Sequence, residues 1–350
     1  MAKKLKIVLA VLLSVIAVLV ITFVGIYWQR FASINTLEEV VDGEFYTMDF
    51  KADYRLSELL SKNLQSDQIF VDEAIKIMYP LLPIKMQAPQ LLCTVFAAEN
   101  PEGEHIFARN YDLTETNGLL LKTSPKDGYK SISMVDLTII DCKAPTDLMN
   151  KMKLLLAPYA TIDGINEKGL GVAALVVKDE PTYQDTGKLP ITTNLALRLM
   201  LDKAANTDEA VELLSGYDMR ASGGSSFHFF ITDASGKTVI VEYYQNKMNV
   251  VEGKVCTNFY LTENAPEDEN KNRCYDRYAI AEKALEESGG VLAPLSAMET
   301  LNKARMDETI EGKYIATQWS EIFVLEQGKV YIVLDRDYEN VFEFSIDSIK

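Results

Sequence analysis

Residues 93–112, CTVFAAENPEGEHIFARNYD, have the pattern of two β-strands joined by a tight turn. Strand-like runs at 93–98 and 105–110 flank Asn100-Pro101-Glu102-Gly103, whose composition is typical of a hairpin loop. If the strands pair, Arg109 and Asp112 return beside Cys93 at one end of a sheet. An arginine there would favour a thiolate, and an aspartate could hold an ammonium group. The hairpin therefore predicts a thiol nucleophile with two charged partners.

Similar strand pairs recur along the C-terminal part of the chain, separated by segments with helical spacing. Strands are predicted at 161–165 with 169–177, 227–232 with 238–244, and 321–325 with 329–334. Helices are predicted at 192–205, 207–214, 275–287 and 295–304. Strand pairs interrupted by helix pairs within about 250 residues indicate an α+β domain, with helices packed on antiparallel sheets.

The N-terminal region contains one long apolar segment. Residues 7–28 carry no charge, and at about 1.5 Å per residue they make roughly 33 Å of helix, enough to cross a bilayer. Lysines precede the segment, and Tyr27 and Trp28 close it, so the positive-inside rule places the rest of the chain outside the cell. A cleaved signal peptide is the alternative, but this segment exceeds the usual h-region and no A-x-A site comes after it. We predict an uncleaved, single-pass anchor in the cell membrane.

The segment between the anchor and Cys93 differs in composition from the rest of the chain. An acidic stretch leads into apolar residues with helical spacing at 54–64 and 71–82, and Pro80, Pro83 and Pro89 end this pattern. We predict short helices with an exposed connection after them. The expected units are a transmembrane anchor at 1–30, a helical propeptide and linker region at 31–92 and a catalytic domain at 93–350.

Charge and histidine content exclude several classes of function. The net charge of -16 argues against nucleic acid as a partner, because phosphate binding needs clustered Lys and Arg. Only His105 and His228 are present, and His228 lies between two phenylalanines in a strand pattern, which favours a packed residue over a catalytic base. These observations argue against a Ser-His-Asp or Cys-His enzyme and against a histidine-ligated zinc site. No cofactor or metal is expected.

The cysteines leave the disulfide pattern open. The chain has four, at positions 93, 142, 256 and 274. Outside the cell an even number suggests disulfides, but with Cys93 free, one pair plus one thiol and no disulfide at all fit equally well. A free cysteine is usually a small buried hydrophobe. The case for Cys93 therefore depends on its neighbours.

These neighbours resemble the start of the choloylglycine hydrolase and penicillin V acylase family of N-terminal-nucleophile hydrolases. That family's pattern is Cys-Thr, a strand, a turn with glycine, and Arg-Asn-x-Asp, which here are Cys93-Thr94, Gly103 and 109–112. The resemblance implies a four-layer αββα sandwich. It also implies that Cys93 is the nucleophile, that Arg109 pairs with its thiol and that Asp112 binds its amine.

Further matches occur in the family's order towards the C-terminus. They lie at 163–171, 255–258, 277–278 and 317–319. By this resemblance Asn258 helps to form the oxyanion hole, and Arg277 is a second active-site arginine, with Arg273 as the fallback for that role. The resemblance covers roughly residues 93–350.

Two departures from the family pattern qualify the expected function. The family's other oxyanion-hole asparagine falls on Val176, so one side-chain donor is missing. Bile-salt hydrolases expose their cysteine by losing only the initiator Met, whereas Cys93 comes after a 92-residue leader. This leader resembles the isopenicillin N acyltransferase and acid ceramidase relatives, which cleave themselves. We therefore expect cleavage at Leu92-Cys93.

The resemblance implies hydrolysis of a linear amide bond through a thioester. The substrate would be a small N-acyl amide, with bile-acid conjugates, penicillin V and fatty N-acyl amino acids all open. Two alternatives remain, an acyltransferase and a membrane-anchored binding domain without catalysis. Assembly into a homo-oligomer is also open.

Overall fold

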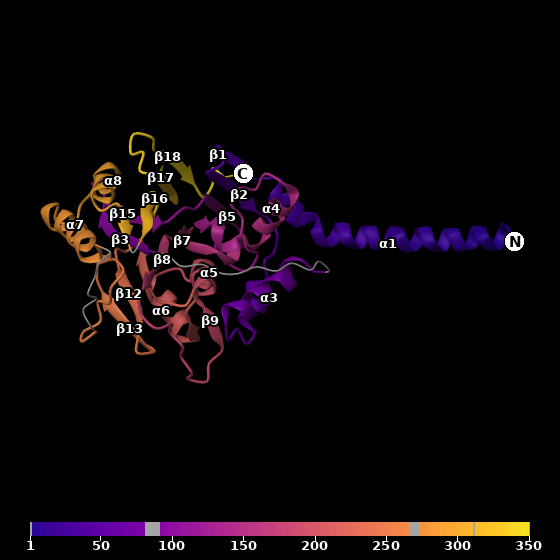
Figure 1. The fold of residues 1–350 in the computed structure, drawn as a ribbon, viewed down its shortest axis with the longest axis horizontal. Helices are drawn as coiled ribbons and strands as arrows, with labels where there is room; N and C mark the ends of the chain where they lie inside the picture. Colours follow the sequence, from indigo (N-terminus) through magenta and orange to yellow (C-terminus); the bar gives the residue numbers. More distant parts are fainter. Residues whose placement is uncertain (1, 81–91, 266–272, 311, 350) are drawn as a thin grey trace.

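Two sheets stack face to face in the computed structural model, which describes residues 2–80, 92–265, 273–310 and 312–349 (Figure 1). The larger sheet is antiparallel except between β2 and β5. Its strands, in order across the sheet, are β1 (Glu38–Val41), β2 (Phe45–Phe50), β5 (Gly118–Thr123), β6 (Ser131–Asp136), β7 (Thr161–Asn166), β8 (Leu170–Val177), β11 (Ser226–Asp233), β12 (Thr238–Tyr244) and β13 (Lys247–Glu252).

The smaller sheet carries the strand that begins at the candidate nucleophile. Its order is β14 (Val255–Cys256), β3 (Leu92–Glu99), β4 (His105–Leu113), β16 (Lys313–Val324), β17 (Lys329–Leu334) and β18 (Phe342–Ser345), with β15 (Asp307–Ile310) paired to β16. A separate parallel pair is formed by β9 (Pro190–Thr192) and β10 (Asp218–Arg220). Apolar side chains fill the space between the two large sheets, where the rings of Phe107, Phe230 and Phe323 stack.

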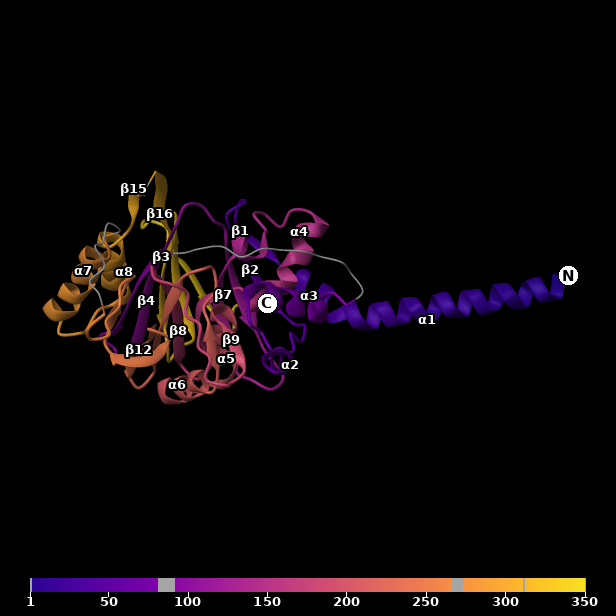
Figure 2. The ribbon, with the colours of Figure 1, turned by 60° about the horizontal axis from the view of Figure 1, so that its bottom comes forward.

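Helices cover both outer faces of the sandwich (Figure 2). The larger sheet is covered by α5 (Thr193–Lys203) and α6 (Thr207–Ser215), and the smaller one by α7 (Cys274–Glu287) and α8 (Pro294–Lys303). This is the αββα arrangement that the family resemblance implied. The expected α+β class is confirmed, and each of the four predicted hairpins and four predicted helices is present. Shorter helical segments are η1 (Leu137–Ile140), α4 (Leu148–Lys153) and η2 (Leu154–Tyr159).

Residues 31–92, expected to form a separate helical propeptide and linker region, also contain strands that belong to the larger sheet. They contain α2 (Leu56–Leu60) and α3 (Asp67–Met78), but also β1 and β2. Strand β2 pairs in parallel with β5 over six residue pairs, from Phe45 with Gly118 to Phe50 with Thr123. The leader thus completes one edge of the larger sheet. The predicted connection after these helices, in which Pro83 and Pro89 lie, is outside the described residues.

Burial on both faces of β2 explains why its sequence did not predict a strand. Tyr46 and Met48 lie in the core under the outer helices, whereas Phe45 lies in the core between the sheets. A strand buried on both sides shows no alternation of apolar and polar residues. In the sequence, β2 is therefore visible only as a short apolar run after an acidic stretch.

The apolar N-terminal segment forms a single long helix, α1 (Ala2–Ile34), that projects from one end of the sandwich (Figure 1). Residues 7–24 are exposed along it, and its length and composition fit either a membrane span or a signal sequence. Its last turns pack on the domain. Tyr27 is fully buried, and Arg30 donates hydrogen bonds to the carbonyls of Ile77 and Met78 at 2.9 and 2.8 Å.

Candidate active site

Cys93 lies near the start of β3, and the β3–β4 pairing brings Arg109 to it. Cys93 pairs with Tyr111, and Val95 pairs with Arg109, so Arg109 projects on the same face of the sheet as Cys93. The Nη2 of Arg109 donates to Sγ of Cys93 at 2.9 Å, and both side chains are fully buried. The predicted return of Arg109 to the thiol is confirmed.

Arg109 is itself held by the larger sheet. Its Nη1 donates to the Ile162 carbonyl at 2.9 Å and to Oδ2 of Asp163 at 2.5 Å, and its Nη2 also donates to the Ala174 carbonyl at 2.9 Å. The guanidinium therefore bridges the two sheets directly behind the thiol. A planar group with fixed donors suits this role, because each N–H is aimed by the same rigid plane.

Asp112 is linked to Cys93 by Arg277, which contacts both residues. Nη1 of Arg277 contacts Oδ2 of Asp112 at 3.2 Å and donates to the Cys93 carbonyl and to the Thr94 hydroxyl, each at 2.6 Å. The hydroxyl of Thr317 donates to the other Asp112 oxygen at 2.6 Å. Arg277 lies near the N-terminus of α7, so this helix places it over the start of β3.

Asn258 lies just after β14 and connects the backbone of Cys93 to the larger sheet. Its Oδ1 accepts hydrogen bonds from the backbone N–H of Cys93 at 3.0 Å and from Nη2 of Arg277 at 2.9 Å. Its Nδ2 donates to the Val176 carbonyl at 2.8 Å. Val176 supplies no side-chain donor, but its backbone fixes the orientation of Asn258. An amide nitrogen has two N–H groups, so the second one is available to another acceptor.

Burial determines the protonation of the thiol in the intact chain. It raises the pKa of Cys93, and the Arg109 guanidinium opposes this shift only in part. Burial also raises the pKa of Asp112, against the opposing charge of Arg277. The thiol is thus neutral near pH 7 and needs a base before it can attack a carbonyl.

The remaining candidates lie outside this cluster. Arg273, the fallback for the second arginine, is partly exposed and contacts Glu308 at 3.1 Å, so Arg277 occupies the position expected for that role. His228 is fully buried and its Nδ1 lies 2.7 Å from Glu242, as expected for a packed strand residue.

Cys142 and Cys256 are buried free thiols. Within the described ranges, no group of His, Cys, Asp and Glu could hold a metal ion.

Sequence reasoning missed two acidic residues behind the site. In the sequence Asp163 belongs to a hairpin motif, and Glu321 begins a predicted strand. Both are fully buried, and Glu321 pairs with Arg109 across β16 and β4. No local sequence signal marks them, because their partners lie on other strands.

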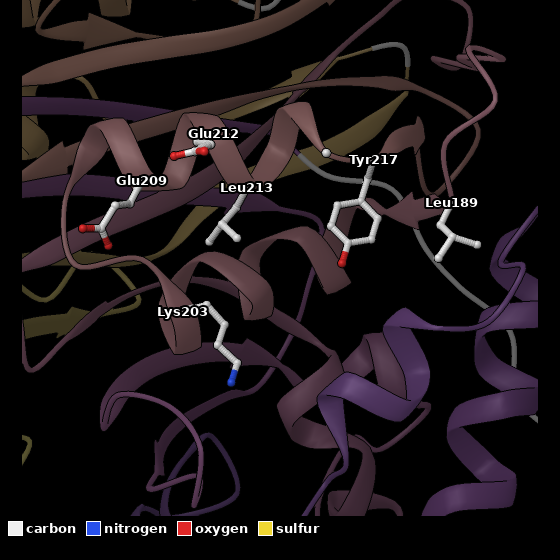
Figure 3. Close-up of a pocket in the computed structure, with 7 residues that line it drawn as sticks. Leu189, Lys203, Glu209, Glu212, Leu213 and Tyr217 are labelled. Carbon is white, nitrogen blue, oxygen red and sulfur yellow. The ribbon is translucent and has the colours of Figure 1, made fainter.

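Two pockets differ in whether their lining residues contact the candidate site residues. One lies on α6 and its surroundings and is lined by Leu189, Lys203, Leu213 and Tyr217 among others, and none of the candidate residues lines it (Figure 3). The other is mainly apolar and lies beside the cluster. Its lining includes Phe70, Val71, Ile139, Tyr159, Ile162, Ala174 and Phe227. Ile162 and Ala174 are the residues whose carbonyls accept hydrogen bonds from Arg109.

Comparison with known proteins identifies the family of this chain. The family model for linear amide C-N hydrolases of the choloylglycine hydrolase family matches residues 93–290, more than half of the chain, and its match begins at Cys93. The chain belongs to this family. A curated relative, the bile salt hydrolase/transferase of Clostridium perfringens, is 27% identical over 174 residues, which are 47% of this chain and 52% of the relative. The match thus spans about half of that relative's length.

Two solved structures from one bacterium share this fold. Two variants of the conjugated bile acid hydrolase from Clostridium perfringens superpose with TM-scores of 0.52 and 0.54 at 20% identity. They cover 72% and 73% of this chain and 92% and 93% of their own. The penicillin V acylase from Agrobacterium tumefaciens is also similar, at 17% identity and a TM-score of 0.49, over 72% of this chain and 86% of its own.

Proposed function

We propose that this protein hydrolyses the linear amide bond of N-acyl amides, with Cys93 as an N-terminal nucleophile after cleavage at Leu92-Cys93. One observation carries the proposal. The thiol of Cys93 faces Arg109 at 2.9 Å, while its backbone nitrogen faces Asn258 at 3.0 Å. The start of β3 thus brings together the Cys93 thiol, the nitrogen that would become its α-amine, and the amide of Asn258 as a hydrogen-bond donor.

Maturation would use the same groups as turnover. Sγ of Cys93 attacks the carbonyl carbon of Leu92, the C–N bond breaks, and the acyl group moves from nitrogen to sulfur while the thiol proton passes to the new amine. Water then cleaves the thioester, which releases the Leu92 carboxylate and restores the thiol. The contacts of Arg277 with the carbonyl of Cys93 support a backbone held in one conformation during this step.

Turnover would then use the α-amine as general base. Its reference pKa of about 7.7–8.0 suits proton transfer near neutral pH. The thiolate attacks the amide carbonyl, and the free N–H of Asn258 together with backbone N–H groups stabilises the oxyanion. The substrate amine leaves with the proton, and water hydrolyses the thioester. Arg109 stabilises the thiolate, and Asp112 with Arg277 fixes the amine end of Cys93.

The apolar pocket supports a hydrophobic acyl group. Ile162 and Ala174 line it, and their carbonyls also accept hydrogen bonds from the arginine that contacts the thiol, so Arg109 connects the pocket wall to the thiol. Phe70 and Val71 of α3 line the same pocket. The leader would therefore shape substrate binding even after the chain is cut. Bile-acid conjugates, phenoxyacetyl penicillin and fatty N-acyl amino acids all present an apolar acyl group.

N-terminal sequencing and turnover by Cys93 variants test this function. The mature wild-type chain is expected to begin at Cys93 and to hydrolyse at least one of these acyl classes. Cys93→Ser should lose both processing and amidase activity, whereas Cys256→Ser, a matched change at another buried thiol, should keep both. An active enzyme in which the Leu92-Cys93 bond is intact would contradict the α-amine mechanism. A processed chain with no labelling of Cys93 by a thiol-reactive acyl amide would favour a binding domain.

Acyl transfer is a second candidate, favoured by the name of the curated relative, which is a hydrolase and transferase. The thioester can react with an amine in place of water. Turnover in the presence of glycine or taurine separates the two outcomes. A new amide product that grows with amine concentration supports transfer, and free acid alone supports hydrolysis.

We also propose that α1 is an uncleaved membrane anchor. Its exposed apolar residues 7–24 and the packing of its last turns against the domain support this assignment. A signal peptide would be removed, whereas these turns hold Arg30 and Tyr27 in contact with the domain. The domain would then lie on the extracytoplasmic side.

A further inference from the structure

A second buried acid lies beside the arginine that contacts the thiol. Glu321 lies on β16 directly opposite Arg109 on β4, and its side chain is fully buried. Its neighbours two positions away, Trp319 and Phe323, pack between the two sheets, so Glu321 projects into the same space. It therefore shares the interior with the thiol site.

The charges in this space do not balance when every acid is ionised. The groups whose charges act on Glu321 are Asp163 from β7, Arg109 from β4 and Cys93 from β3. The ring of Tyr111 lies 5.5 Å from the Arg109 guanidinium, and β17 places Ile332 opposite Glu321. One guanidinium would meet two carboxylates even before a thiolate forms. A surplus charge in a dry interior is costly, so a proton is expected on one carboxyl.

The hydrogen bonding identifies where that proton lies. Oδ1 of Asp163 and both carboxyl oxygens of Glu321 have no hydrogen-bond partner among the described residues, whereas Oδ2 of Asp163 is bound to Arg109. The two carboxyls lie within hydrogen-bonding reach of each other. A proton on Glu321 would satisfy one oxygen on each carboxyl with a single O–H donor. Burial and the charge of Asp163 both raise the pKa of Glu321 well above its usual range.

We propose that Glu321 is a neutral positioning acid, whose carboxyl O–H donates to Asp163 and so leaves Arg109 with one counterion and its Nη2 directed at the Cys93 thiol. Glu321 acts through Arg109 and does not touch the reacting atoms. This assignment rests on the proposed function and deepens it, because it names the group that keeps Arg109 available to stabilise the Cys93 thiolate. The protonation of Glu321 can be measured without measuring catalysis.

A neutral Glu321 predicts a specific dependence on pH. While Glu321 keeps its proton, Arg109 is free to stabilise the thiolate. When pH rises through the elevated pKa of Glu321, a second carboxylate competes for Arg109 and opposes thiolate formation. Activity should therefore rise as the α-amine loses its proton and fall again when Glu321 ionises.

Infrared spectroscopy of the full chain in detergent tests the protonation state directly. The wild-type spectrum near neutral pH should contain a protonated carboxyl band that is lost in Glu321→Gln. Glu326→Gln, a partly exposed acid just beyond β16, serves as the control and should leave that band unchanged. Absence of a band difference between wild type and Glu321→Gln would overturn the proposal, whether or not the protein hydrolyses amides.

Kinetics of two Glu321 variants test the positioning role. Glu321→Gln is neutral and keeps an N–H donor for Asp163, so its activity should stay within about threefold of wild type and its alkaline decline should disappear. Glu321→Leu has no donor, and its rate of Cys93 alkylation and its kcat should fall about tenfold or more. If Gln impairs the enzyme as much as Leu does, or keeps the alkaline decline, Glu321 does not act as a neutral donor.

Discussion

At the scale of single residues, the site depends on Asn258 for two separate tasks. Its Oδ1 accepts hydrogen bonds from the backbone N–H of Cys93 and from Arg277. Its Nδ2 donates a hydrogen bond to the Val176 carbonyl, which fixes the orientation of the amide. In the proposed mechanism, the missing side-chain donor at 176 leaves oxyanion stabilisation to this amide and to backbone N–H groups. A variant that keeps the acceptor and removes the donor separates the two tasks.

We predict that Asn258→Asp lowers kcat by about 10²–10³, the usual effect of losing an oxyanion donor. The aspartate still offers an oxygen to Cys93 and Arg277 but loses the hydrogen bond to the Val176 carbonyl, so the comparison of kcat requires a Tm close to that of wild type. Steady-state kinetics on protein whose N-terminus has been confirmed as Cys93 measure the effect. Asn302→Asp, near the C-terminal end of α8, is the matched control. Unchanged kcat in Asn258→Asp would remove Asn258 from the oxyanion hole.

At the scale of elements, the pairing of β2 with β5 couples the leader to the catalytic domain. Backbone hydrogen bonds along six residue pairs are joined by side-chain contacts, in which Tyr54 donates to Asp202 at 2.6 Å and Tyr79 to the Met152 carbonyl at 2.6 Å. Burial of each large apolar side chain of β2 contributes about 1.5–3 kcal/mol. Cleavage of one peptide bond removes none of these contacts.

We therefore predict that the leader stays bound after processing at Leu92-Cys93. The two fragments should separate under denaturing conditions but purify together through a tag on the N-terminal fragment, even at high salt. Met48→Asp places a charge in the core under the outer helices and should release the catalytic fragment, whereas Glu38→Gln on the exposed edge should not. Release of the wild-type catalytic fragment in native buffer would contradict this prediction.

At the scale of the whole molecule, α1 contributes little to the stability of the domain until its last turns. Residues 7–24 are exposed, while Tyr27 and Ile34 are buried against the domain. The exposed part of α1 and the folded domain are thus separable along one helix. The physical reason is that the first part of α1 has no protein partner within the described residues.

Deletion of residues 1–24 should therefore release an active protein into solution without a large change in Tm. Fractionation of cells measures membrane association, and thermal unfolding measures stability. A longer deletion, of residues 1–34, removes the buried Tyr27 and Ile34 and should lower the Tm. If the shorter deletion leaves the protein in the membrane fraction, α1 is not the sole attachment.

The sequence by itself determined the elements whose signal is local. Hairpins and helices on the C-terminal side arise from periodicity, and the position of Arg109 relative to Cys93 arises from the geometry of a two-strand hairpin. The tertiary structure alone decided that β2 completes the larger sheet, that Asp163 and Glu321 lie behind Arg109, and that Val176 orients Asn258 through its backbone. These contacts join residues far apart in the chain, and a buried partner on another strand leaves no pattern in its neighbours.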